Sequence, residues 1–370
     1  MSFSRILRWF APLLVAAPLA LILVEGAVRV GVLGGGGLLP MVRIANKKGD
    51  PKGGIRPGSL VLLCYPTNYR GYFKIDLADP KTYAYYESVG MRNMDKALPA
   101  RHYAVEQPFN SQVYLGPEFP EKREGVTRVV IMGDSFNMGW GLRPEDRVST
   151  RLEKHLNDAQ PGKWEVVNAG IPSGDFPELY YKYREILPLK PDILILGMTL
   201  NDVMRKPELA QPPLESSPLV MVRRVEEPPK LGFFDLRIKL FFDRARRDAA
   251  DTKVMIDWYR ALGSDDNMTG IVATRQYIRE MDAELKNRGG RFLLAMWPLL
   301  VPWDKGYPLT EIHEHNAGFA QARGIEFADL LPPLLGHKAE DLWLHPVDRH
   351  PNDVASELAA QRLAKAILRQ

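Results

Sequence analysis

Five short apolar runs punctuate the chain between residues 126 and 370, separated by stretches with the residue spacing of amphipathic helices. The runs lie at 128–132, 164–168, 192–198, 291–297 and 325–329. Strands that alternate with helices in this way form a parallel sheet, and they are apolar along their whole length because helices cover both faces of the sheet. The pattern predicts an α/β fold with a doubly wound parallel sheet of about five strands.

Helices are expected between and after these runs. The first begins at Pro144, because proline fits the first turn of a helix, and Glu145 and Asp146 are favourable near its positive end. The apolar spacing predicts further helices over 177–187, 271–288, 309–322 and 353–369.

Composition limits the classes of protein to which the chain can belong. Its 370 residues, 45% of them apolar, suffice for one large core with additional segments. The 49 basic and 45 acidic residues are spread evenly, so no nucleic-acid partner is expected. Cys64 is the only cysteine, which excludes an intramolecular disulfide and a thiolate metal site.

The N-terminal segment has the character of a membrane anchor. The run 9–24 carries no charge and follows Arg5 and Arg8. At 1.5 Å per residue, its roughly 16 residues span about 24 Å, and extension to residue 33 covers the hydrocarbon core of about 30 Å. We therefore expect a cytoplasmic tail at 1–8 and a transmembrane helix at 9–33.

The orientation of this anchor follows from the charges around it. Arg5 and Arg8 favour a cytoplasmic N-terminus, and long domains cross the membrane largely regardless of their charge. The expected location is the bacterial cytoplasmic membrane, with a single span and a globular domain that faces the periplasm or the exterior. A cleaved signal peptide and a buried soluble helix are the alternatives.

Two further segments lie outside the regular pattern. Residues 34–125 are expected to form a glycine linker at 34–37 and an irregular extension with strand-like pieces at 59–63 and 71–75. Residues 203–270 form an insertion that begins rich in proline and is a candidate lid or substrate wall.

Within the insertion, apolar residues recur at helical spacing, and they are Phe234, Ile238, Phe241 and Phe242. Such a helix packs on its own domain or lies on a membrane surface. Trp258 and Tyr259 are either core residues or aromatic side chains that stack on a sugar ring.

Polar residues interrupt the pattern at the carboxyl ends of the predicted strands and before the last helix. These positions are Ser135, Asn168-Ala169-Gly170, Asn201-Asp202 and residues 348–352. The carboxyl ends of parallel strands share one edge of the sheet, which is where ligands bind in such folds. A nucleophilic hydroxyl needs a base and a set of oxyanion donors, and this edge offers all of these groups.

The order Gly133-Asp134-Ser135, then Gly170, then Asn201, then His350 resembles the SGNH superfamily, also called the GDSL hydrolases. The resemblance covers residues from about 125 to 370. It implies the flavodoxin-like SGNH hydrolase fold in a membrane-anchored bacterial member, with the hydrolase domain at 126–370. It also implies a serine esterase that needs neither a metal nor a cofactor.

The roles that the resemblance implies fall on named residues. Ser135 would be the nucleophile and His350 its general base, with Asp348 orienting the imidazole. The oxyanion donors would be the backbone N–H groups of Ser135 and Gly170 and the side-chain amide of Asn201.

Two positions depart from the family pattern. The usual acid lies three residues before the histidine, where this chain has Val347, whereas Asp348 lies two before it. The third motif usually has a glycine where Thr199 stands. Among the alternative readings, Ser135 caps a turn or helix, and His345, Asp348 and His350 bind a metal. His313 and His315 are expected to be solvated.

The expected function is hydrolysis of an ester through an acyl-enzyme, with an O-acetyl group on an extracytoplasmic glycan as the first substrate to test. One alternative is a polysaccharide O-acyltransferase, since the acylation step uses the same residues. Another is a glycan-binding or assembly protein that has lost the reaction.

Overall fold

The computed structural model describes residues 19–26, 60–64, 73–76, 104–172, 174–210, 237–345 and 348–369. Residues 19–26 are helical, and the rest of the expected anchor at 9–33 lies outside these ranges. No helix within the described ranges is long and apolar enough to cross a membrane.

Five parallel strands form the central sheet, in the spatial order β5-β4-β6-β7-β8. Their bounds are β4 Thr127–Gly133, β5 Trp164–Gly170, β6 Ile193–Met198, β7 Arg291–Met296 and β8 Glu326–Asp329. Counted along the chain this is the order 2-1-3-4-5, which is that of flavodoxin-like doubly wound sheets. The predicted sheet is confirmed, strand by strand.

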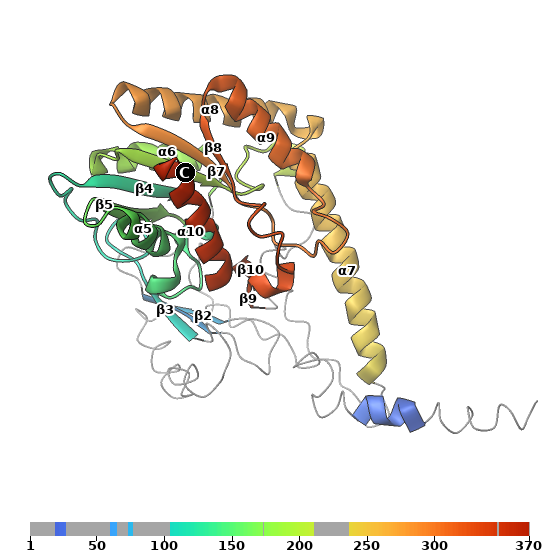
Figure 1. Cartoon of the computed structure of the whole chain (residues 1–370). Helices are drawn as coiled ribbons and strands as arrows, with labels where there is room; N and C mark the ends of the chain where they lie inside the picture. The colour runs from blue at the N-terminus through green and yellow to red at the C-terminus, as the bar shows by residue number, and fades with distance from the viewer. Residues whose placement is uncertain are drawn as a thin grey trace, which may run out of the picture.

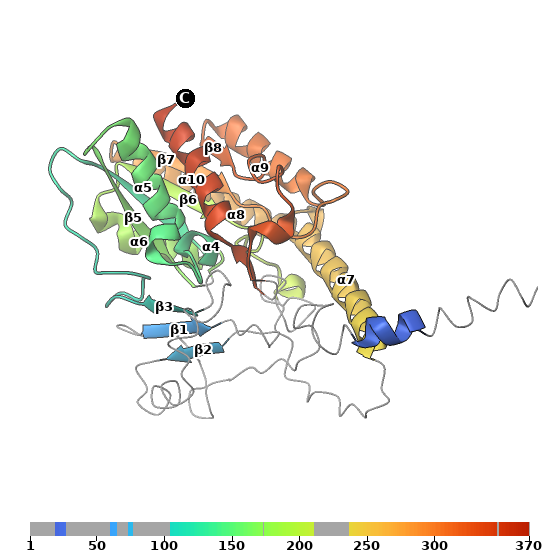
Figure 2. The ribbon, with the colours of Figure 1, turned by 60° about the horizontal axis from the view of Figure 1, so that its bottom comes forward.

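Helices cover both faces of this sheet (Figure 1). The helices are α5 Val148–Ala159, α6 Glu178–Ile186, α7 Arg237–Leu262, α8 Met268–Asn287, α9 Thr310–Arg323 and α10 Asp353–Leu368. Helices α5 and α10 pack against each other on one face, and α6 and α8 pack on the other (Figure 2). The helix predicted to begin at Pro144 instead starts as a 3₁₀ turn, Pro144–Asp146, and α5 begins only after the extended residue Arg147.

Two small antiparallel sheets accompany the central one. Strands β1 Leu60–Cys64, β2 Phe73–Asp76 and β3 Ala104–Pro108 form the first, in the order β2-β1-β3. Strands β9 Trp343–His345 and β10 Asp348–Pro351 form the second, immediately before α10. The sequence indicated β1 and β2 within one or two residues but not the other three strands.

Helix α7 projects from the domain, and its last turns are anchored in the core (Figure 2). Tyr259 is buried, and the Trp258 ring lies between Tyr259 and the Arg205 guanidinium. These two aromatic residues are therefore core residues and do not present a surface for a sugar ring. Phe234 and the side chains of Ile238, Phe241 and Phe242 lie outside the described part of the chain.

One histidine prediction is wrong. His313 is 2% exposed, and its Nδ1 lies 2.8 Å from Oδ1 of Asp329. The reason is that α9 places this face against β8, where the Asp329 carboxylate is available as a partner. His315 is exposed, as expected.

Candidate active site

Ser135 is the first residue of a one-turn helix, α4 Ser135–Met138, at the carboxyl end of β4. Asp134 is the N-cap, and its Oδ1 accepts a hydrogen bond of 3.0 Å from the Phe136 amide. The amide of a first helical residue has no acceptor inside the helix, so the Ser135 N–H is available to stabilise an anion.

Three glycines allow α4 to lie directly on the sheet. Gly133 pairs in register with Gly170 on β5 and with Gly197 on β6, so the three form a row across the ends of adjacent strands. A Cβ on Gly170 would collide with the Met138 backbone, and a Cβ on Gly133 or Gly197 would collide with the Asn137 side chain. Only glycine at these positions leaves room for the serine-bearing turn.

Two asparagines then fix this turn. The Asn137 Nδ2 donates to the Gly197 carbonyl at 2.6 Å, and its Oδ1 accepts from Trp297 Nε1 at 3.1 Å. The Asn168 Nδ2 lies 3.2 Å from the Met138 carbonyl, one of the groups left unpaired at the end of the helix. Ser135 is thereby held on a rigid support.

His350 and Asp348 approach Ser135 from β10. Oγ of Ser135 lies 2.8 Å from Nε2 of His350, and Nδ1 of His350 lies 2.5 Å from Oδ1 of Asp348. Asp348 is fully buried and His350 is 5% exposed, with its ring edge-on to Phe136. The three side chains therefore form one connected chain, although they come from positions 215 and 2 residues apart.

This arrangement bears on the metal alternative. Both ring nitrogens of His350 have partners, Ser135 on one side and Asp348 on the other. Within the described part of the chain, no group of three or more side chains of the ligating types is placed to hold a metal ion.

The Gly170 amide, one of the expected oxyanion donors, has a hydrogen-bond partner in its own strand. Its N–H donates to Oδ1 of Asn168 at 3.0 Å, so this hydrogen is used inside β5 and is not directed at an oxyanion beside Ser135. The contact of Gly170 with α4 gives the glycine a packing role instead. The bond depends on how the Asn168 side chain folds back, which spacing alone does not show.

A second glycine lies in the loop that follows β5. Gly174 has a φ of 151°, a conformation that favours glycine. Its loop is joined to the third motif, because the Phe176 amide donates to the Asp202 carbonyl at 2.8 Å. Gly174 is not among the predicted oxyanion donors, and its place in the loop directly after β5 is the signal that points to it.

Asn201 is linked to the serine turn through Thr199. The Thr199 hydroxyl lies 2.8 Å from Oδ2 of Asp134 and 3.1 Å from Oδ1 of Asn201. From the other side, the Arg205 Nη2 donates to the Asn201 carbonyl at 3.0 Å. The third motif is thus held beside Asp134, the neighbour of Ser135.

Two buried carboxyl groups face this hydroxyl. Asp134 is 1% exposed, and Asp202, whose Oδ1 lies 3.0 Å from the Thr199 hydroxyl, is 0% exposed. Burial raises the pKa of Asp134. Burial, and then the nearby charge of Asp134, raise the pKa of Asp202 well above its ordinary value.

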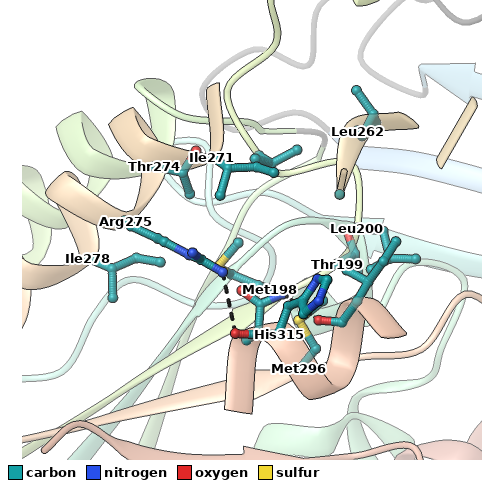
Figure 3. Close-up of a pocket in the computed structure, with 14 residues that line it drawn as sticks. Met198, Thr199, Leu200, Leu262, Ile271, Thr274, Arg275, Ile278, Met296 and His315 are labelled. Atoms are coloured by element: carbon teal, nitrogen blue, oxygen red, sulfur yellow. Dashed lines mark hydrogen bonds between the residues drawn. The ribbon is translucent and has the colours of Figure 1, made fainter. Parts of the chain in front are cut away.

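Two cavities lie near the site. The first is behind the third motif, lined mostly by apolar side chains and by Arg275, whose Nη2 donates to the His315 carbonyl at 3.3 Å (Figure 3). Its volume of about 30 Å³ is close to that of one water molecule, and neither Ser135 nor His350 lines it. A larger groove of about 560 Å³ lies between α7 and Arg349, the residue before His350.

Comparison with known proteins places the chain in a family. Residues 131–358 match the sequence model of the GDSL-like lipase/acylhydrolase family. No curated protein matches the chain significantly.

Solved structures show a distant likeness. A lipase/acylhydrolase from Enterococcus faecalis is 15% identical, with a TM-score of 0.39, and the match covers 65% of this chain and 95% of that one. A member of the lipolytic G-D-S-L family from Veillonella parvula DSM 2008 is 13% identical, with a TM-score of 0.38 over 66% of this chain and 100% of that one. The acetyl xylan esterase AlAXEase is 15% identical, with a TM-score of 0.38 over 65% and 99%. Since the family's sequence model matches more than half of the residues, the chain belongs to the GDSL-like lipase/acylhydrolase family.

Proposed function

We propose that the protein is a serine esterase that works through an acyl-enzyme. The observation that carries this proposal is the chain of contacts from Ser135 Oγ to His350 Nε2 at 2.8 Å and from His350 Nδ1 to Asp348 Oδ1 at 2.5 Å. A buried carboxylate at Nδ1 fixes the tautomer in which Nε2 is free to accept a proton. This is what a hydroxyl needs in order to become a nucleophile.

The proposed reaction has two halves. Ser135 Oγ forms a bond with the ester carbonyl carbon while its proton moves to Nε2 of His350. The tetrahedral intermediate then collapses, the alcohol leaves with that proton, and the acyl group stays on Ser135. In the second half, water attacks the acyl carbonyl carbon and gives a proton to Nε2 of His350. Ser135 Oγ then leaves with that proton, and the acid is released.

The developing oxyanion needs donors in place before the reaction. The Ser135 N–H at the start of α4 and the Nδ2 of Asn201 are the proposed pair, and the Gly174 N–H is the candidate third donor in place of Gly170. Loss of one such donor costs on the order of 2.7 to 4 kcal/mol in the barrier. Asn201→Ala should therefore reduce kcat by about 100-fold or more.

The test uses purified full-length protein in detergent and p-nitrophenyl esters from acetate to long acyl chains. We expect turnover by the wild type and none above background by Ser135→Ala or His350→Ala. A fluorophosphonate probe should label the wild type once, on Ser135. A folded wild-type protein that neither hydrolyses any of these esters nor reacts with the probe would refute the proposal.

For the substrate we propose an acetylated glycan outside the cytoplasm. The support for the location is the uncharged run at 9–24 and the exposed apolar side chains Leu19, Ile22 and Leu23 of the described helix, which suit a membrane anchor. Membrane fractionation and protease accessibility in intact cells test the location. Release of acetate from acetylated polysaccharides, with and without an acceptor sugar, tests the substrate and separates hydrolysis from transfer.

A further inference from the structure

Thr199 occupies a crowded position in the hydrogen-bond network below the proposed oxyanion site. Its single hydroxyl faces three oxygens, at 2.8 Å in Asp134, 3.0 Å in Asp202 and 3.1 Å in Asn201. Thr199 itself is 4% exposed, so water has little access to the hydroxyl. The family pattern has a glycine here, which could supply none of these contacts.

The hydrogens available do not suffice if both carboxyl groups are ionised. A threonine hydroxyl donates one hydrogen and accepts on its lone pairs, whereas carboxylates only accept. With both Asp134 and Asp202 charged, the Thr199 hydrogen would go to a carboxylate, the stronger acceptor, and Oδ1 of Asn201 would face a lone pair. Burial instead favours the protonated form of both carboxyl groups, which lie 2.8 and 3.0 Å from the hydroxyl and can then donate to it.

With both carboxyl groups protonated the network closes. Protons on Oδ2 of Asp134 and on Oδ1 of Asp202 are donated to the two lone pairs of the Thr199 hydroxyl, and the hydroxyl hydrogen is donated to Oδ1 of Asn201. Two further donors lie beside Asp202. The Thr199 amide donates to its Oδ2 at 2.8 Å, and Nδ2 of Asn201 lies 3.4 Å from its Oδ1. One Nδ2 hydrogen of Asn201 is then left for the oxyanion.

We propose that Thr199 is a positioning residue, whose hydroxyl, donated to Oδ1 of Asn201, fixes the carboxamide with Nδ2 towards the acyl group on Ser135. The inference rests on the proposed esterase function and adds to it a residue that does not touch the substrate. Because Oδ1 of Asn201 accepts from the Thr199 hydroxyl, the carboxamide is kept from turning its oxygen towards the oxyanion.

Other charged groups also act on this network. His350 lies near Asp134 and favours its ionised form, whereas Asp175 opposes ionisation of Asp202. Arg205 lies 3.3 Å from Asp175 and offsets part of its charge. Loss of either carboxyl proton at alkaline pH would return the Thr199 hydrogen to a carboxylate and release Asn201.

The experiment compares Thr199→Val, which keeps the shape and removes the hydroxyl, with Thr199→Ser, which keeps the hydroxyl. The matched control is Thr274→Val, which also removes a buried threonine hydroxyl, one that accepts from the Met204 amide at 2.8 Å outside the network. Steady-state kcat and KM are measured for a p-nitrophenyl ester from pH 5 to 10, together with urea unfolding of each variant.

We expect Thr199→Val to lower kcat on the order of tenfold with KM changed less than twofold, and Thr199→Ser to recover most of the loss. The wild type should lose rate at alkaline pH in a step that Thr199→Val lacks, and Thr274→Val should affect stability only. Equal kcat for Thr199→Val and wild type, or equal losses for the valine and serine variants, would overturn the role of Thr199 alone. A wild type without any turnover would instead refute the esterase function, and the role of Thr199 with it.

Discussion

His350 and Asp348 lie two residues apart on β10 and are joined twice through one oxygen. Oδ1 of Asp348 lies 2.5 Å from Nδ1 of His350 and accepts from the His350 backbone amide at 3.1 Å. Side chains at positions i and i+2 of a strand point to the same face, so a two-residue offset brings carboxylate and imidazole together. The strand conformation thereby lets a carboxylate at position 348 reach the imidazole, although the family pattern has its acid at position 347.

The first prediction concerns this pair. Asp348→Asn should lower kcat by up to about 10⁴-fold, because an amide at this position favours the wrong imidazole tautomer while the shape is preserved. Asp341→Asn is the control, since it removes the same charge from an exposed carboxyl group in the preceding turn. Ester turnover by the two purified variants is the measurement. A rate within tenfold of wild type for Asp348→Asn would show that another group orients His350.

The fold was predictable where the sequence signal is long and local. Apolar runs of five to seven residues located all five strands of the central sheet, whereas α4 has only 4 residues and β9 only 3, too few to show a period. The positions of Ser135 and His350 followed from motif order. The hydrogen bond of the Gly170 amide and the burial of His313 did not. The first depends on the conformation of the Asn168 side chain, and the second on Asp329, which only the folded chain brings near His313.

The second prediction concerns the glycine row. Gly170→Ala would place a methyl group against the Met138 backbone, so α4 must shift and carry Ser135 away from His350. We expect a loss of stability of about 1–3 kcal/mol and a fall in kcat of at least tenfold. Gly318→Ala is the control, because Gly318 lies in α9 with open space around it and alanine there should be neutral or stabilising. Urea unfolding and ester turnover report both effects, and an active, equally stable Gly170→Ala variant would contradict the packing role.

The third prediction concerns a buried ion pair at the other edge of the sheet. Arg128 is 1% exposed, and its Nε lies 2.8 Å from Oε1 of Glu165. Arg128→Met leaves the buried Glu165 carboxylate with only Arg123, whose Nε lies 3.4 Å from its Oε2, so the variant should cost about 3 kcal/mol of unfolding free energy. The double variant with Glu165→Leu should recover part of this loss. As the control, Lys154→Ala breaks an exposed pair and should cost less than about 1 kcal/mol.

Urea titrations of the Arg128 and Glu165 single variants and of the double variant give the coupling between the two residues. Purely additive losses would show that the pair does not behave as a unit. An additive result would leave two other hydrogen bonds as the main contribution of the Arg128 side chain, from Nη1 to the Leu189 carbonyl at 2.9 Å and from Nη2 to the Pro120 carbonyl at 3.0 Å.

The fourth prediction concerns the pH dependence of stability that arises from the Asp134–Asp202 pair. Burial raises the folded-state pKa of Asp202 well above its ordinary value of 3.8, so the folded protein keeps a proton that the unfolded chain releases. Its contribution to stability is complete below pH 3.8 and is lost as pH rises through the folded-state pKa, by at most about 1.4 kcal/mol per pH unit. Asp202→Asn keeps an oxygen for the Thr199 amide and removes this titration, so its unfolding free energy should fall less steeply with rising pH than that of the wild type.

The control for this prediction titrates in the opposite direction. The hydrogen bond from Lys253 lowers the pKa of the exposed Asp257, so its contribution is present at neutral pH and is lost as pH falls. Asp257→Asn should therefore alter stability only above about pH 4, and by a constant amount through the neutral range. Urea unfolding of wild type and both variants at intervals from pH 4 to 9 gives the three curves. Parallel curves for wild type and Asp202→Asn would mean that the buried pair holds no extra proton, and the hydrogen count at Thr199 would then need another donor.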